Sequence, residues 1–104
     1  MLPENPTIDQ VREFFAHDKF ATEAAGCAIV EATRGHAVCE LAIEDTHRNA
    51  LGNVMGGAVF TLADFALAIA SNVGQPPSVS VNSAIDFTSA AKGTRLTATC
   101  DVVK

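Results

Sequence analysis

A single carboxylate interrupts the most apolar stretch of the chain. Residues 57–72, GAVFTLADFALAIASN, are apolar at most positions, and Asp64 lies in their middle. The apolar residues fall on every face of a helix, which predicts a helix enclosed on nearly all sides. Because an unpaired buried carboxylate is costly, two interpretations of Asp64 are open. It is a catalytic base or nucleophile, or it lies on one exposed strip of the helix or is satisfied by a hydroxyl such as that of Thr61 or Ser71.

The start of the same helix offers a second chemical group. Gly56 and Gly57 leave backbone N–H groups unobstructed by side chains at a helix N-terminus, where the helix dipole favours negative charge. Such amides can act as an oxyanion hole for a carbonyl under attack. The alternative is that the two glycines only permit a tight turn and close helix packing.

These two groups are too far apart to meet within one molecule. Gly56 and Asp64 are eight residues apart, which at the rise of an α-helix is roughly 12 Å along the axis. One carbonyl carbon cannot contact both. If both act on the same carbonyl, Asp64 of one subunit must face Gly56 of another, in a two-fold arrangement with two equivalent sites at one interface.

The flanking sequence predicts the elements that position these groups. Thr7 and Gln10 form a capping-box pattern at the start of a helix, and alternating apolar residues on both sides of Gly35 indicate a hairpin. The expected elements are a short helix at about 8–17, strands at 27–32 and 37–43, a loop at 44–54, the central helix at 57–72, and strands at 79–87 and 94–103.

This order of elements indicates an α+β fold. We expect a single domain over residues 1–104, with an antiparallel sheet curved around one central helix. Four strands make a small sheet, and the last strand ends at Lys104 with no chain left to cover its edge. We therefore expect either a truncated piece of a longer domain or an edge covered by a partner subunit.

The segment 47–72, HRNALGNVMGGAVFTLADFALAIASN, resembles the signature of PaaI-type hotdog-fold acyl-CoA thioesterases. That signature has an HxN segment, a Gly-Gly helix start and a helix Asp at fixed offsets, and here Asn49 precedes Gly56 by seven residues and Asp64 by fifteen. Downstream, SVSVNSAIDF and the turn at 91–93 resemble the next strand and turn. The resemblance implies a hotdog fold, an antiparallel sheet wrapped around a long central helix, with C-terminal strands missing or truncated.

The resemblance also implies an activity, the hydrolysis of aryl- or medium-chain acyl-CoA to the free acid and coenzyme A. Asp64 would activate water or attack the thioester, the Gly56 amide would polarise the carbonyl across a subunit interface, and Asn49 would orient the substrate or the water. No cofactor is implied apart from coenzyme A as part of the substrate, and the implied assembly is a homodimer or homotetramer. The further residues implied at the substrate are Met55, Gly57, Ser80, Arg48 and His47.

The implied substrate-binding roles of three of these residues are less direct. Arg48 is a candidate for the phosphates of coenzyme A by its charge alone, and His47 more simply shapes the loop. Met55 stands where many members of the family have His, so any hydrogen bond from that His is absent.

The Met55 departure and the short C-terminus motivate an alternative, a non-catalytic hotdog protein that binds acyl-CoA or another acyl ligand. Hotdog dehydratases and hydratases use a His near their acid, and no His lies in 57–72.

The composition argues against several other classes of protein. A net charge of −5 and 48% hydrophobic residues are typical of a soluble globular protein, and the seven Lys and Arg residues are too scattered to bind nucleic acid. The apolar stretch 56–70 is shorter than the roughly 20 residues of a membrane span. The N-terminus lacks the features of a signal peptide, so we expect a cytoplasmic location. The three cysteines lack metal-site spacing and are expected to be buried thiols, with no metal site.

Overall fold

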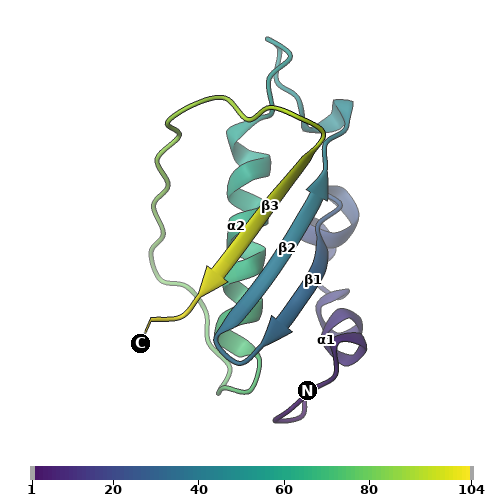
Figure 1. The fold of residues 1–104 in the computed structure, drawn as a ribbon, viewed down its shortest axis with the longest axis vertical. Coiled ribbons are helices and arrows are strands. Elements are labelled where there is room, and N and C mark those ends of the chain that lie inside the picture. Colours follow the sequence, from purple (N-terminus) through teal and green to yellow (C-terminus); the bar gives the residue numbers. More distant parts are fainter. Residues whose placement is uncertain (1, 104) are drawn as a thin grey trace.

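The protein is described by a computed structural model over residues 2–103. The strands form one layer, α2 crosses behind it, and α1 lies beside β1 (Figure 1). The predicted α+β class with a central helix is confirmed. The elements in chain order are α1 (Ile8–Phe15), the π-helix η1 (Phe20–Ala24), β1 (Ala28–Thr33), β2 (His36–Ala42), the 3-10 helix η2 (Asp45–His47), α2 (Gly56–Asn72) and β3 (Arg95–Asp101).

The strands form an antiparallel sheet in the order β1-β2-β3. The predicted hairpin is confirmed, because β1 pairs with β2 down to Thr33 opposite His36. Gly35 in the turn has a φ of 74°, a left-handed conformation that glycine adopts without a steric penalty. Alternate residues of β2 face the core and are buried, namely Ala37, Cys39 and Leu41.

The central helix α2 packs one face against the sheet. Its buried residues recur at intervals of three and four, as expected for one stripe of a helix: Leu62, Phe65, Ala66, Ile69 and Ala70. The prediction that this helix is enclosed on nearly all sides is wrong for the single chain, because the sheet covers only one side and Asp64 on another is exposed. No helix within residues 2–103 has the length and hydropathy to cross a bilayer.

The helix α1 begins with the predicted capping box and is tied to the sheet by an arginine. Thr7 Oγ1 accepts the Gln10 N–H at 3.2 Å, and Gln10 Oε1 accepts the Thr7 N–H at 2.9 Å. Arg12 donates from Nε and Nη2 to the Ile29 carbonyl oxygen, at 3.2 and 2.9 Å. The helix ends at Phe15, earlier than the predicted 17, and the chain then enters η1.

The strand predicted at 79–87 is absent, whereas the strand predicted at 94–103 is present as β3. Residues 79–94 run beside α2 and then over its N-terminal end before the chain enters β3 (Figure 1). Val79 and Val81 are 90% and 99% exposed. An extended segment becomes a strand only when its backbone pairs with a neighbour, and one edge of β3 stays unpaired among the described residues. The prediction of a strand at 79–87 from its alternating sequence is therefore wrong.

Candidate active site

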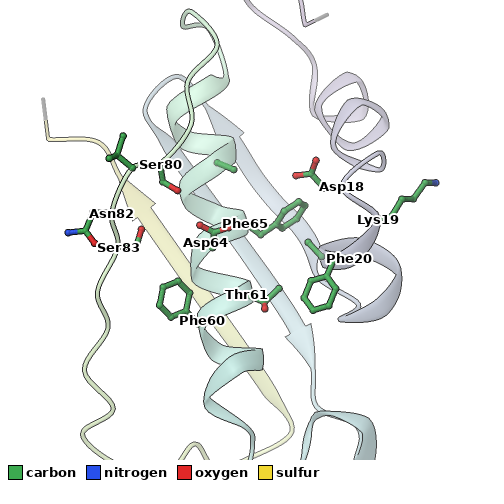
Figure 2. Close-up of a pocket in the computed structure, with 13 residues that line it drawn as sticks. Asp18, Lys19, Phe20, Phe60, Thr61, Asp64, Phe65, Ser80, Asn82 and Ser83 are labelled. Atoms are coloured by element: carbon green, nitrogen blue, oxygen red, sulfur yellow. The ribbon is translucent and has the colours of Figure 1, made fainter.

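Asp64 faces an open cavity beside α2. The cavity has a volume of about 700 Å³, and Figure 2 shows Asp64 between the segment that carries Ser80 and the region that leads into η1. A molecule in this cavity can therefore contact the carboxylate directly. The other residues that line it are Asp18, Lys19, Phe20, Ala21, Phe60, Thr61, Phe65, Ala68, Val81, Asn82 and Ser83.

The surroundings of Asp64 decide between the structural explanations offered for it. The Thr61 hydroxyl donates to the Gly57 carbonyl oxygen at 2.7 Å, and the Ser71 hydroxyl donates to the Leu67 carbonyl oxygen. Neither hydroxyl satisfies Asp64, so that explanation is wrong. Within residues 2–103 the carboxylate has no hydrogen bond or ion pair, and in the single chain it lies on the exposed side of the helix. The carboxylate oxygens are therefore available to a ligand.

Ser80 is the predicted site residue that the fold brings to the cavity of Asp64. Both residues line this cavity and an adjoining one. The segment with Ser80 is anchored to the C-terminal end of α2, because Asn72 Oδ1 accepts the Ser78 N–H at 2.8 Å and Asn72 Nδ2 donates to the Ser78 carbonyl oxygen at 3.3 Å. The anchor places the Ser80 hydroxyl, which can both donate and accept a hydrogen bond, across the cavity from the Asp64 carboxylate.

The start of α2 presents open backbone amides. The helix begins at Gly56, one residue before the predicted start, and its N-cap Met55 makes no side-chain capping bond. The Ala58 N–H donates to the Met55 carbonyl oxygen at 3.0 Å, whereas the N–H groups of Gly56 and Gly57 have no partner within residues 2–103. Two donors at the positive end of the helix dipole are thus free for a carbonyl oxygen or an anion.

The loop before α2 is closed by two of the predicted site residues. Asn49 Oδ1 accepts the backbone N–H groups of Leu51 and Asn53 at 3.0 and 3.1 Å. Arg48 Nη1 donates to the Gly52 carbonyl oxygen at 2.9 Å. Both residues therefore shape the turn, while the amide nitrogen of Asn49 has no hydrogen bond within the described part of the chain.

His47 ties this loop to the chain ahead of β1. It is 7% exposed. Its Nδ1 accepts the Glu44 N–H at 2.9 Å, so the proton is on Nε2, which donates to the Ala25 carbonyl oxygen at 2.7 Å. Neither ring nitrogen is free for a substrate, and His47 shapes the loop.

The predicted residues thus form two groups at different points along α2. Asp64 and Ser80 share a cavity midway along the helix, and neither the glycine pair nor Asn49 lines it. Since α2 is continuous from Gly56 to Asn72, the distance from Gly56 to Asp64 is roughly 12 Å along its axis. One chain cannot place both groups on the same carbonyl.

One wall of the cavity was missed by the sequence analysis. Asp18, Lys19 and Phe20 line it at the entry to η1, and Phe20 is 69% exposed. A π-helix of five residues has no distinct sequence signal. The exposed aromatic residue just after the first predicted helix was the one available hint.

The three cysteines are free, and none of them lines the cavity of Asp64. Burial raises the pKa of Cys39 to about 12, with smaller contributions from Cys27 and Cys100. A thiol of this kind is neither a nucleophile nor a metal ligand at neutral pH. Among the described residues no group of three or more His, Cys, Asp or Glu side chains could hold a metal ion.

A sequence model of the thioesterase superfamily matches residues 51–104 of the chain. The matched region holds the glycine pair, Asp64 and Ser80. Acyl-coenzyme A thioesterase 13 of Homo sapiens is 35% identical over 79 residues, which cover 73% of this chain and 56% of that protein. The chain spans 60% or less of the length of the curated relatives that it matches.

Solved structures show the same similarity in three dimensions. Thioesterase superfamily member 2 from Mus musculus superposes with a TM-score of 0.77 at 28% identity, covering 92% of this chain and 73% of that one. The E. coli PaaI protein from the phenylacetic acid degradation operon superposes with a TM-score of 0.72 at 28% identity, covering 89% of this chain and 71% of that one. The expected hotdog fold is confirmed, with three of its strands and its central helix present within residues 2–103.

Proposed function

The chain belongs to the thioesterase superfamily, and on this premise we propose that it hydrolyses acyl-CoA thioesters to a free acid and coenzyme A. Water adds to the thioester carbonyl, the C–S bond breaks, and coenzyme A leaves as the thiol. The observation that carries the proposal is the Asp64 carboxylate, which faces a cavity that it shares with Ser80. Its lack of a partner within the described residues leaves it free to act on water or on the substrate.

In this proposal Asp64 has one of two roles. As a general base it takes a proton from the water that attacks the carbonyl. As a nucleophile it attacks the carbonyl itself, and water then hydrolyses the resulting anhydride. The Ser80 hydroxyl, on the facing wall, can hydrogen-bond the attacking water or the carboxylate in either route.

The carbonyl oxygen would be bound by the partner subunit's Gly56. The open N–H at the start of α2 is suited to the charge that develops on this oxygen. Because the same helix carries Asp64 roughly 12 Å away, the proposal requires a homodimer with two equivalent sites, alone or within a tetramer. Asn49 would use its free amide nitrogen to orient substrate or water at this end of the site.

We propose aryl or medium-chain acyl groups as substrates. The cavity next to Asp64 is lined by three aromatic rings, Phe20, Phe60 and Phe65, which favour an apolar acyl group. The similarity to a protein of the phenylacetic acid degradation operon agrees with an aromatic acyl group.

The proposal is tested by measuring thiol release from phenylacetyl-CoA and hexanoyl-CoA with Ellman's reagent. We expect hydrolysis by the native protein and a rate at least ~10²-fold lower for Asp64→Asn, because the variant cannot accept a proton or attack. The matched control is Asp9→Asn, which removes a carboxylate that is 90% exposed on α1. An Asp64→Asn variant that hydrolyses as fast as the native protein would remove Asp64 from the chemistry.

A non-catalytic acyl-CoA binding protein is the second candidate. Met55 stands at the N-cap of α2, where many members of the family have His, and it is 56% exposed and makes no capping bond. No imidazole therefore assists the carbonyl at this point. Calorimetric titration with acyl-CoA separates the two candidates. Binding that survives Asp64→Asn, together with no thiol release by the native protein, identifies a binding protein.

A further inference from the structure

Phe87 packs directly on the first residue of α2. A Cβ atom built on Gly56 would lie 3.1 Å from Phe87 Cζ and 3.2 Å from Cε1, closer than side chains normally approach. Any residue larger than glycine at this position would therefore displace the ring. The ring is also 58% exposed, so its other side is open to a ligand.

The ring lies at the Cβ position of Gly56, in the helical turn that carries the open amides. In an α-helix the Cα–Cβ bond is tilted toward the N-terminus, and the unpaired N–H groups of the first turn point in the same direction. An aromatic ring at the Cβ position of Gly56 is thus a neighbour of whatever the Gly56 and Gly57 amides bind.

Phe87 also contacts α2 from the far end of the segment that forms the wall with Ser80. The near end is anchored where Asn72 bonds Ser78, and the segment then passes over the N-terminal end of α2 (Figure 1). Between these two points the described structure shows no strand pairing. The packing of Phe87 on Gly56 is therefore a contact that connects this otherwise unpaired segment to the start of α2.

We propose that Phe87 is a specificity-determining residue, whose ring limits the size of the group attached directly to the thioester carbonyl. This inference rests on the proposed function, in which the Gly56 amide binds that carbonyl oxygen. When the Gly56 amide binds the carbonyl oxygen of the thioester, the acyl carbon attached to that carbonyl lies beside the Phe87 ring. Acyl groups with a CH₂ at that carbon fit, whereas groups branched at that carbon meet the ring. Among the aryl and medium-chain acyl groups proposed above, the ring thus selects those with a CH₂ next to the carbonyl, such as phenylacetyl, over those branched at that carbon.

Butyryl-CoA and isobutyryl-CoA test the inference, because they have the same number of carbons and differ only in branching. We expect the native protein to prefer butyryl-CoA in kcat/KM by roughly tenfold or more, the size of effect that one misplaced methyl group produces. Phe87→Ala should raise the ratio of isobutyryl to butyryl hydrolysis by about tenfold, and Phe87→Leu should give an intermediate ratio. Phe14→Ala, which removes a 41% exposed ring from α1, should leave the ratio unchanged.

The steric contact itself is tested by a double substitution. Gly56→Ala keeps the backbone N–H but places a methyl group against the ring, so it should lower kcat/KM for butyryl-CoA, and Gly56→Ala with Phe87→Ala should recover part of the loss. A ratio that stays within twofold of native in Phe87→Ala, in a protein that hydrolyses butyryl-CoA, overturns the role of Phe87 and leaves the proposed function intact. A native protein that hydrolyses neither these esters nor phenylacetyl-CoA overturns both.

Discussion

The two polar atoms of the Asn49 side chain have different roles. One role is structural, and the other is the chemical role proposed above. Its Oδ1 accepts two backbone N–H groups and closes the loop before α2, whereas its Nδ2 has no partner within residues 2–103. The loop delivers the chain to Gly56, so the geometry of the open amides depends on Oδ1. Orientation of a substrate or water would depend on Nδ2.

We predict that Asn49→Asp separates these two roles. The carboxylate keeps the acceptor for the loop and lacks the amide donors, so the melting temperature should stay near the native value while kcat/KM falls by about tenfold. Asn49→Ala loses the acceptor as well and should also lower the free energy of unfolding, by about 1–2 kcal/mol. Thermal denaturation and thiol release on the same samples check this. Native activity in Asn49→Asp would assign the residue to the loop alone.

At the scale of elements, one histidine connects all three strands at the end of the sheet. His36 opens β2, and its Nδ1 lies 2.6 Å from Asp101 Oδ1 at the end of β3, while its Nε2 lies 3.6 Å from Glu31 Oε1 on β1. The hydrogen bond to Asp101 raises the pKa of His36 above 6.5, and the charges of Asp101 and Glu31 add to the shift. These two carboxylates are the charged groups in contact with the imidazole among the described residues.

We predict that this cluster makes stability depend on pH above 6.5. A raised pKa means that the folded state holds the proton more tightly, so the contribution is fully present below 6.5 and is lost as the pH rises through the folded-state value. The melting temperature should therefore fall between pH 6 and pH 8.5, and His36→Gln should flatten this part of the profile. Asp9→Asn, which removes a carboxylate of α1 that is not in contact with His36, should retain the native profile. A fall of the same size in His36→Gln would assign the pH dependence to other groups.

In the molecule as a whole, two sets of proposed site residues lie at different points along one helix, although both must act on one substrate. The sheet encloses only one face of α2, and the exposed side carries Asp64 and the cavity. The open amides lie at the N-terminal end of the same helix. A two-fold axis beside the helices would bring the two sets together in pairs.

We predict that two inactive variants restore activity when their subunits are mixed. Asp64→Asn removes the carboxylate, and Gly56→Pro removes the N–H at the first helical position, where proline fits the helix backbone. A mixed dimer contains one site with both groups intact, so random mixing after unfolding and refolding should recover about a quarter of the native rate. Each variant refolded alone is the control. No recovery, with mixed dimers shown by native mass spectrometry, contradicts a shared site.

Features of the fold that depend on local interactions could be predicted from the sequence. The Thr7 capping box, the hairpin at Gly35 and the helix that carries Asp64 follow from side-chain bonding to nearby backbone, turn geometry and hydrophobic pattern, which act over a few residues. The spacing from Gly56 to Asp64 along a helix likewise follows from the fixed helical rise.

Features that depend on partners distant in the chain could not be predicted and became apparent in the folded molecule. The segment 79–87 has the alternation of a strand but lies along α2, because pairing requires a neighbouring strand that its sequence cannot specify. The hydrogen bond from His47 to Ala25, the wall at Phe20 and the packing of Phe87 on Gly56 each join residues at least 20 positions apart. Which side of α2 is exposed, and hence where Asp64 points, was set by the side that the sheet covers.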